Sequence, residues 1–260
     1  MDLQLKDKVI IVTGGAQGIG AAIVFACGQE GAIPVIVGLG ANAAEELQRQ
    51  LHGHRVVSHF IETELSEPEN CKRAVDETVR TFGRIDALVN NAGRNDGVGL
   101  ERGDPEGFLN SVKGNLWHYY SMAHYALPYL KRSRGAIVNI GSKVAETGQG
   151  GTSGYAASKG GILGLTREWA AELLPYSVRV NCVIPAEVMT PLYESWLQTF
   201  PNPEEKLPAI LSKIPLEKRM TKAEEIAAMA VFLISARSGH TTGQELHVDG
   251  GYVHLDRALT

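Results

Sequence analysis

Tyr155 and Lys159 stand four residues apart and form the pair whose types and spacing most directly indicate chemistry. In a helix, side chains at this spacing share one face, so an ammonium lies beside a phenol. A free tyrosine has a pKa of about 10, too high for a base near neutral pH. A neighbouring cation stabilises the phenolate and lowers that pKa. The pair therefore predicts a proton-transfer device, although the same spacing arises by chance on many amphipathic helices.

A glycine-rich segment near the N-terminus predicts a phosphate-binding turn. Residues 8–13 form a short apolar run rich in β-branched side chains, which is typical of a buried strand. Gly14, Gly18 and Gly20 follow, and residues 21–27 have the composition of a helix. Glycines allow close backbone approach, and a helix N-terminus presents free N–H groups to a pyrophosphate. The alternative is a tight turn that only needs positive φ angles.

The glycine spacing and the Tyr-x-x-x-Lys pattern together resemble the short-chain dehydrogenase/reductase family over essentially the whole chain. Further matches follow in the order typical of that family. They are Asn90-Asn91-Ala92-Gly93 after an apolar run, Asn115 in a helical stretch, Ser142 after a strand-like run, Asn181 to Pro185 leading to Thr190, and Val248 to Gly251 at the last strand. The resemblance implies an oxidoreductase that uses NAD or NADP.

Alternating strand and helix patterns predict one α/β domain over residues 1–260, a Rossmann-type doubly wound parallel sheet with helices on both faces. Seven strands are expected near residues 8–13, 33–38, 55–60, 85–89, 135–141, 178–184 and 244–248. Helices are expected over 18–30, 42–52, 67–82, 105–133, 152–174 and 222–236. The proline-rich segment 186–216 is expected to form a lid of short helices over the site. Ligands bind at the carboxyl ends of the strands in such sheets, where the motifs fall.

The composition is that of an ordinary globular protein, with 44% hydrophobic and 21% charged residues. The net charge of -4 and the lack of a basic tract give no reason to expect nucleic-acid binding. We find neither a signal peptide nor an apolar run long enough to span a membrane. Cys27, Cys71 and Cys182 are too few and too scattered for a disulfide framework or a zinc site. We therefore expect reduced thiols in a cytoplasmic protein.

The resemblance assigns catalysis to four residues. Tyr155 is the general base in alcohol oxidation and the acid in the reverse direction, and Ser142 hydrogen-bonds the same substrate oxygen. Lys159 lowers the tyrosine pKa and holds the nicotinamide ribose, and Asn115 anchors a water that carries the proton towards solvent. Hydride passes directly to the nicotinamide, so the reaction needs no metal. Two alternatives stay open: Ser142 as a turn residue, and Asn115 as a polar residue at a helix kink.

The expected cofactor site combines the glycine turn with the carboxyl ends of several strands. Its residues are Gly14, Gln17, Gly18, Ile19, Gly20, Gly38, Leu39, Glu64, Leu65, Asn91, Ala92, Gly93, Tyr155, Lys159, Pro185, Val188 and Thr190. Asn91 is expected to stabilise the central sheet beside the cofactor rather than to do chemistry.

Recognition of the cofactor ribose departs from the usual pattern. An Asp at the end of the second strand would recognise a 2′-hydroxyl, and an Arg after it a 2′-phosphate. Gly38 and Leu39 stand there, Gln17 in the glycine turn is neutral, and Glu64-Leu65 occupies the place of the usual Asp beside the adenine. Discrimination should be weak, and we expect NAD with NADP tolerated.

Polar loop residues indicate a polar substrate. Segments 148–155 and 184–193 and the tail 251–259 resemble those of bacterial L-fucose dehydrogenases in this family, apart from Ala186-Glu187, where Pro-Gly is usual. The loops supply Asn95, Asp96, Glu146, Gln149 and Glu187 as candidate substrate ligands. We expect oxidation of L-fucose or a similar aldose to its lactone. The alternative is that such side chains are merely solvated.

Two other functions compete with sugar oxidation. A 3-oxoacyl-carrier-protein reductase would favour NADPH and would need a basic patch for its acidic carrier, and the sequence offers an anchor for neither. A catalytically silent cofactor-binding scaffold would usually have lost Ser142, Tyr155 or Lys159, and all three are present.

The resemblance also implies a homodimer or homotetramer. The expected helices over 105–133 and 152–174 carry apolar residues on more than one face, so the second face suits a partner. Burial of both faces within one subunit is the alternative. The tail from Val253 to Thr260 is expected to reach towards the active site of a neighbouring subunit.

Overall fold

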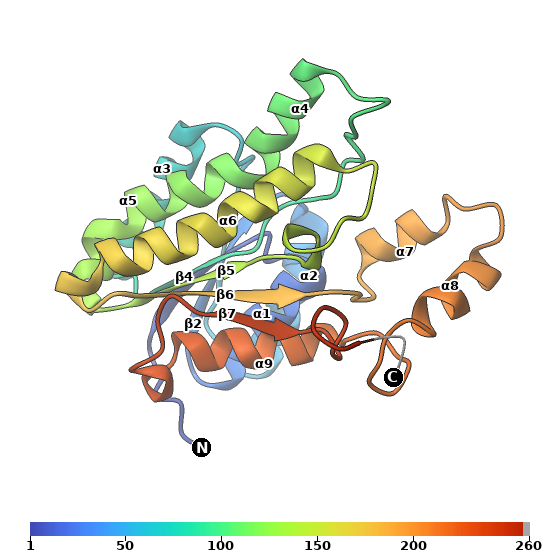
Figure 1. Cartoon of the computed structure of the whole chain (residues 1–260). Coiled ribbons are helices and arrows are strands. Elements are labelled where there is room, and N and C mark those ends of the chain that lie inside the picture. The colour runs from blue at the N-terminus through green and yellow to red at the C-terminus, as the bar shows by residue number, and fades with distance from the viewer. Residues whose placement is uncertain (257–260) are drawn as a thin grey trace.

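Seven parallel strands form one sheet in the order β3-β2-β1-β4-β5-β6-β7 in the computed structural model, which describes residues 1–256 (Figure 1). The strands are β1 (Val9–Thr13), β2 (Ile33–Gly38), β3 (His59–Glu62), β4 (Ala87–Asn90), β5 (Ala136–Ile140), β6 (Arg179–Pro185) and β7 (Glu245–Val248). The strand order reverses at β1, which pairs with β2 on one side and β4 on the other. This switch point opens the crevice where ligands bind in such sheets. The expected fold class is confirmed.

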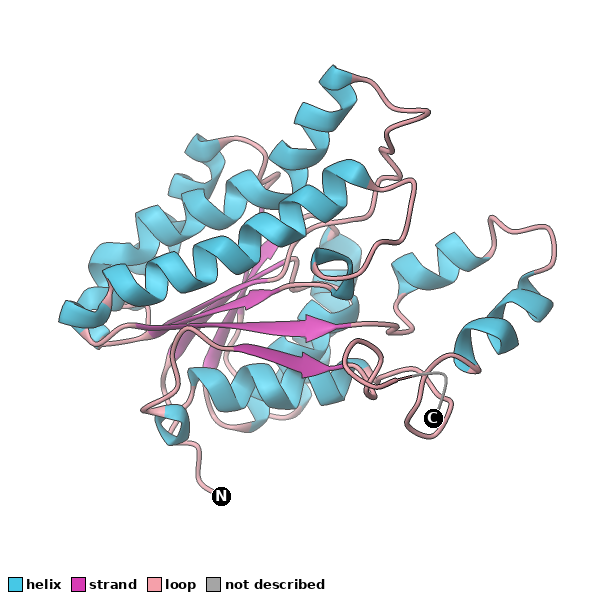
Figure 2. Ribbon diagram, in the orientation of Figure 1, coloured by secondary structure: helices cyan, strands magenta, loops and turns pink. Residues whose placement is uncertain are grey.

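Helices cover both faces of the sheet, as Figure 2 shows in cyan around the magenta strands. They are α1 (Gly18–Gln29), α2 (Ala41–Gly53), α3 (Pro68–Phe82), α4 (Pro105–Val112), α5 (His118–Ser133), α6 (Ser153–Glu172), α7 (Pro191–Leu197), α8 (Pro203–Leu211) and α9 (Ala223–Ile234). Helices α3, α5 and α6 cover one face, and α1, α2 and α9 the other. None of the helices within residues 1–256 is long and apolar enough to cross a membrane.

Strand β1 shows how the sequence builds the two cores. Its side chains alternate between the faces of the sheet, so Val9 and Ile11 join the core beneath α3, α5 and α6. Ile10 and Val12 join the core beneath α1, α2 and α9. All four are essentially inaccessible to solvent. A strand buried on both faces needs a continuous apolar run, which is what the sequence contains.

Two expected elements differ from the structure. The predicted helix over 105–133 is interrupted by a π-helical turn, η1 (Lys113–Trp117), between α4 and α5. The strand predicted at 55–60 begins only at His59. Arg55 has a left-handed φ of 62° and the Val56 N–H bonds back to the Leu51 carbonyl, so this stretch still closes the end of α2. Local composition did not reveal either feature.

Segment 186–216 supplies α7 and α8, which project beyond the carboxyl ends of the strands and are drawn in orange in Figure 1. Thr190 caps α7 by accepting a hydrogen bond from the Tyr193 N–H. Tyr193, Trp196 and Phe200 then form a chain of edge-to-face ring contacts. The predicted short helices are present, while the lid motion itself stays a prediction.

Candidate active site

Helix α6 carries Tyr155 and Lys159 one turn apart, as the spacing predicts. Lys159 is buried, and Tyr155 is partly exposed. The Lys159 Nζ donates hydrogen bonds to the Ile140 carbonyl at 2.7 Å and to the Tyr119 hydroxyl at 3.2 Å. It lies 5.6 Å from the centre of the Tyr155 ring. The end of β5 and the first turn of α5 therefore hold the ammonium beside the phenol.

Burial dominates the electrostatics of this pair. It raises the pKa of Tyr155 to about 12, and the hydrogen bond with Ser142 opposes that rise. It lowers the pKa of Lys159 to about 8, with Cys182 acting in the opposite sense. The expected lowering of the Tyr155 pKa is therefore not found in the protein alone. The physical reason is that the ammonium bonds to Ile140 and Tyr119, so desolvation of the phenol is left uncompensated.

Tyr119 is a functional residue that sequence reasoning missed, because it looked only like an apolar aromatic on a helix face. It is completely buried, and its hydroxyl donates to the Ile140 carbonyl at 3.0 Å. The same hydroxyl accepts from Lys159. Burial raises its pKa well above the ordinary value, so it stays a neutral phenol. Tyr119 is a positioning residue for Lys159, since it fixes where the ammonium sits.

Asn115 lies in the π-helical turn η1 and is almost fully buried. Its Oδ1 accepts from the Arg94 N–H at 2.8 Å, and its Nδ2 donates to the Ser111 carbonyl at 3.0 Å. The amide thus satisfies backbone groups at a helix irregularity, which is the alternative that the sequence left open. A π-helical turn inside an α-helix often marks a functional site. The proposed water-anchoring role of Asn115 stays a prediction.

The glycine turn is shaped by a close backbone approach. Gly14 and Gly18 have left-handed φ angles of 61° and 55°. A Cβ on Gly20 would lie 2.1 Å from the Gly14 carbonyl oxygen, which no side chain tolerates. The Asn91 Nδ2 donates to the Thr13 and Gly14 carbonyls at 3.0 and 3.2 Å. Asn91 therefore stabilises the turn beside the cofactor site, in line with its expected role.

The N-terminus of α1 faces this turn. The helix follows Gln17, which makes no side-chain cap, and its first turn holds no acidic residue. Its first N–H groups can therefore receive a pyrophosphate. On the other side of the turn, the Thr190 methyl lies 3.2 Å from the position that a Cβ on Gly18 would take. Val188, three residues after Pro185 in the same connection, is buried. The β6–α7 connection thus packs onto the glycine turn, as the expected cofactor set requires.

The adenosine end of the site carries no charge at the end of β2. Gly38 closes the strand with a φ of 146°, and Leu39 after it is 62% exposed. Glu64 accepts hydrogen bonds from the Ser66 N–H at 2.9 and 3.0 Å, so its carboxylate organises the turn before α3. Leu65 is buried beside it. The structure places these residues at neighbouring strand ends, since β2 pairs with β3.

Two of the expected substrate residues, Glu187 and Glu146, interact with different side chains near Ser142. Glu187 forms a buried ion pair with Lys143, the residue after Ser142. Glu146 lies three residues further along the same turn, and its Oε1 is 2.7 Å from the His247 Nε2. The other expected residues lie in exposed loops. The Asn95 Oδ1 accepts from the Gly97 N–H within its own loop, Asp96 accepts from Ser111, and Gln149 is exposed.

Lys143, Tyr193 and Tyr252 complete this region. Tyr193 and Tyr252 fall in the segments 184–193 and 251–259 that suggested a sugar substrate, whereas Lys143 was not singled out from the sequence. The Lys143 Nζ lies 4.1 Å from the centre of the Tyr252 ring. Tyr193 hydrogen-bonds Glu187, and burial together with that carboxylate raises its pKa far above the ordinary value. We call Lys143, Glu187, Tyr193 and Tyr252 the substrate rim. Glu187 is the member of this rim that the sequence predicted as a substrate ligand.

The C-terminal turn folds back onto its own chain. The Asp249 carboxylate accepts from the Gly251 N–H at 2.8 Å and the Val253 N–H at 2.9 Å. The expected approach of the tail to a neighbouring subunit concerns residues 253–260, of which 257–260 lie outside the described residues.

Comparison with known proteins places the chain in a family. A family model described as enoyl-(acyl carrier protein) reductase matches residues 14–253. L-fucose dehydrogenase of Bos taurus is 37% identical over 252 residues, covering 96% of this chain and 91% of that protein. The 3-oxoacyl-(acyl-carrier-protein) reductase of Thermotoga maritima is 35% identical over 252 residues, covering 96% and 100%. This fucose dehydrogenase is mammalian, whereas the sequence segments suggested bacterial ones.

A solved structure supports the same placement. The crystal structure of a dehydrogenase designated Cj0485 superposes with a TM-score of 0.94 at 48% identity, covering 100% of this chain and 99% of the other.

Proposed function

This chain belongs to the short-chain dehydrogenase/reductase family, whose members act on alcohol and carbonyl groups with NAD or NADP, and on that basis we propose that it oxidises L-fucose or a similar aldose to its lactone. The observation that carries the proposal is the buried Lys143–Glu187 pair directly beside Ser142. A buried ion pair gives a polyhydroxyl ligand both donors and acceptors. An acyl chain would exclude water from this ion pair and offer no hydrogen bonds in its place, at a cost in binding.

In the proposed reaction, Ser142 and Tyr155 hold the anomeric hydroxyl between them. Tyr155 takes the hydroxyl proton as the general base. Bound nicotinamide supplies the acceptor for the hydride. Lys159, held by Ile140 and Tyr119, would hydrogen-bond the ribose hydroxyls of the cofactor, and its charge 5.6 Å from the Tyr155 ring would oppose the rise in the phenol pKa that burial causes. Asn115 anchors a water that returns the proton to solvent.

We propose NAD as the cofactor, with NADP tolerated. The reason is the uncharged end of β2, where Gly38 and Leu39 offer neither a carboxylate for a 2′-hydroxyl nor a guanidinium for a 2′-phosphate. The glycine turn, the N-terminus of α1 and Thr190 would hold the pyrophosphate. A ratio of kcat/KM for the two cofactors above about a hundredfold, roughly 2.7 kcal/mol, would contradict weak discrimination.

The direct test is an assay of the purified protein with NAD and a panel of aldoses, following NADH and identifying the lactone. We expect turnover on L-fucose and on aldoses that share its ring stereochemistry. The second candidate is reduction of a 3-oxoacyl thioester, favoured by the family description and by the Thermotoga maritima relative. Turnover on such thioesters with NADPH, with none on sugars, would replace the proposal by this candidate.

We also propose a homodimer or homotetramer in the cytoplasm. Tyr119, Ile162, Leu163 and Trp169 are buried, so this side of the helices serves the core. Trp117 and Tyr120 stay half exposed along a groove lined by Val112, Leu116, Tyr125 and Leu165, and this second face suits another copy of the chain. The three cysteines are free and buried, which fits a reducing compartment. Light scattering of the wild type and of Trp117→Glu tests the assembly, and a monomeric wild type would refute it.

A further inference from the structure

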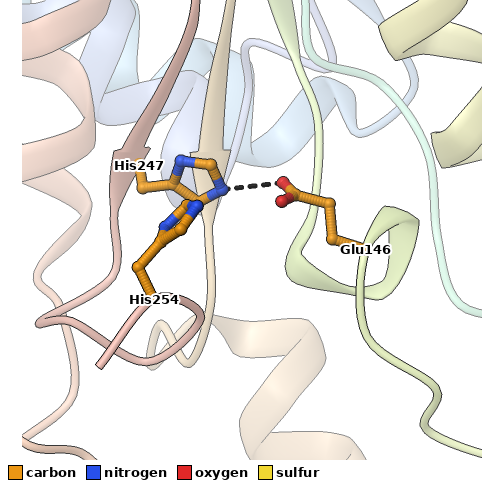
Figure 3. A group of neighbouring side chains, drawn as sticks. All are labelled: Glu146, His247 and His254. Atoms are coloured by element: carbon orange, nitrogen blue, oxygen red, sulfur yellow. Dashed lines mark hydrogen bonds and ion pairs between the residues drawn. The ribbon is translucent and has the colours of Figure 1, made fainter. Parts of the chain in front are cut away.

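We propose that Glu146, His247 and His254 form a binding site for a divalent transition metal, best matched by Zn²⁺. One carboxylate oxygen and one nitrogen from each imidazole all lie within 4.8 Å of one another. Figure 3 shows the three side chains converging from separate segments. The hydride transfer proposed above does not require this metal, so the inference stands apart from the choice of substrate.

The donor set and its geometry both suit zinc. Two imidazoles and one carboxylate, with a water in the fourth position, are a known zinc ligand set. The His247 Nε2 already lies 2.7 Å from the Glu146 Oε1, and the two imidazole rings are 4.3 Å apart at nearly a right angle. Ligand atoms around tetrahedral zinc lie about 3.4 Å apart, as follows from the metal–ligand distances. The ligand atoms lie within 4.8 Å of one another, so binding of zinc would need them to move closer together.

Each ligand sits on backbone that is already fixed. His247 lies on β7, paired in register with Ile184 of β6. Glu146 ends the short turn η2 (Lys143–Ala145), where its N–H bonds to the Lys143 carbonyl. His254 follows the turn that the Asp249 carboxylate organises. A site assembled from ordered segments loses little conformational entropy when the metal binds.

The local charges also favour a cation. The nearest ammonium of the substrate rim, on Lys143, is neutralised by Glu187. Glu146 supplies a carboxylate, and imidazole binds metals through a ring nitrogen that carries no proton. The His247 side chain is only 15% exposed, whereas Glu146 and His254 are exposed, so the site lies at the surface and is open to metal from solvent. The bound metal would fasten the C-terminal turn to the turn beside Ser142.

Metal binding can be tested without any activity assay. After treatment with EDTA and dialysis, the full chain is titrated with ZnCl₂ by calorimetry and with CoCl₂ by absorption spectroscopy. We expect one equivalent of zinc, intense visible bands of tetrahedral cobalt, and a melting temperature raised by about 5 °C at a hundredfold excess over Kd. His254→Ala and Glu146→Gln should each weaken zinc binding by at least about tenfold.

The exposed His240 provides a matched control outside the cluster. His240→Ala should bind zinc as the wild type does, and the metal-free melting temperature of His254→Ala should equal that of the wild type. Absence of binding at about 100 μM zinc, which corresponds to roughly 5.5 kcal/mol, would overturn the proposal. Equal affinity in the wild type and His254→Ala would also overturn it, because the metal would then sit elsewhere.

Discussion

The glycine turn between β1 and α1 and the substrate rim lie at the same edge of the sheet, but different atoms hold them in place. Backbone groups build the turn: left-handed glycines, the first N–H groups of α1, and carbonyls held by the Asn91 amide. Charged and phenolic side chains build the rim, with Lys143 paired to Glu187 and covered by the Tyr252 ring.

This difference separates two kinds of specificity. A site made of backbone fits any ligand with a pyrophosphate, and it fails when added atoms obstruct it. A site made of side chains selects by charge and hydrogen-bond pattern, and it changes when one group is replaced. Substitutions in the turn should therefore affect folding and cofactor binding, whereas substitutions in the rim should affect the sugar alone.

Tyr155 hydrogen-bonds Ser142, the residue before Lys143 of the rim, and its replacement should give the largest effect. Tyr155→Phe removes the general base, so we expect kcat to fall by about 10³-fold, within the range for lost acid–base catalysis. Cofactor binding, followed by the fluorescence of NADH, should change little. Retention of most of the wild-type rate in this variant would contradict the proposed mechanism.

Gly20→Ala tests the turn. The new Cβ would lie 2.1 Å from the Gly14 oxygen and 2.6 Å from the Asn91 Nδ2, so the turn must shift. We expect a loss of about 1–3 kcal/mol in the free energy of unfolding, the usual cost of overpacking, and weaker NAD binding. The control is Gly53→Ala at the end of α2, where a Cβ meets nothing within 4 Å. Urea unfolding measures the free energy of unfolding of both variants. Equal losses in the two variants would refute the prediction that the close approach at Gly20 shapes the turn.

Glu187→Gln tests the rim. The amide keeps the shape of the side chain but leaves Lys143 without its counter-charge. We expect KM for the sugar to rise by about tenfold, roughly 1.4 kcal/mol, with KM for NAD within about twofold. Exposed Glu194 on α7 gives the matched control Glu194→Gln. An equal rise in both Michaelis constants would show that the two regions are not separable.

The pH dependence of stability tests the buried lysine next to the cofactor region. Lys159 has a pKa of about 8 in the folded protein and 10.5 as its ordinary value. Between these values the unfolded chain binds the proton that the folded protein has lost, so its contribution to stability increases with pH, by up to about 1.4 kcal/mol per pH unit. This contribution of Lys159 to stability is lost as the pH falls through 8. Urea unfolding of the wild type and Lys159→Met from pH 7 to 10 should differ by this slope, and parallel curves would contradict the assignment.

Leu39→Arg should give the smallest effect. A guanidinium after β2 can bind a 2′-phosphate, so we expect kcat/KM with NADP to rise by up to about tenfold, roughly 1.4 kcal/mol. KM for the sugar should not change, because Leu39 lies at the adenosine end. Leu39→Gln is the uncharged control. A change in KM for the sugar without a change in kcat/KM for NADP would show that Leu39 acts on the substrate site and not on the adenosine site.

The sequence predicted features whose cause is local in the chain. Gly14, Gly18 and Gly20 are contiguous with the strand and helix that they join, and Tyr155 and Lys159 share one helix, so spacing alone located them. Contacts between distant segments were missed. Tyr119 meets Lys159 across 40 residues and Lys143 meets Glu187 across 44, and such pairs depend on how the sheet is assembled. The irregularity at Asn115 was predicted only as an alternative, because it depends on a distant contact: the Asn115 amide accepts from the Arg94 N–H and donates to the Ser111 carbonyl.

The pairing of β1 with β4 has a consequence for synthesis on the ribosome. The segment that becomes the glycine turn is made early, yet the amide that braces it belongs to Asn91, about seventy residues later. At typical translation rates of about 5–20 residues per second, Asn91 is synthesised roughly 4–14 s after this segment. During that interval the strand Val9–Thr13 can pair with β2 but not with β4. Nascent chains halted before Asn91 should therefore depend on chaperones, whereas chains halted after β5 should not.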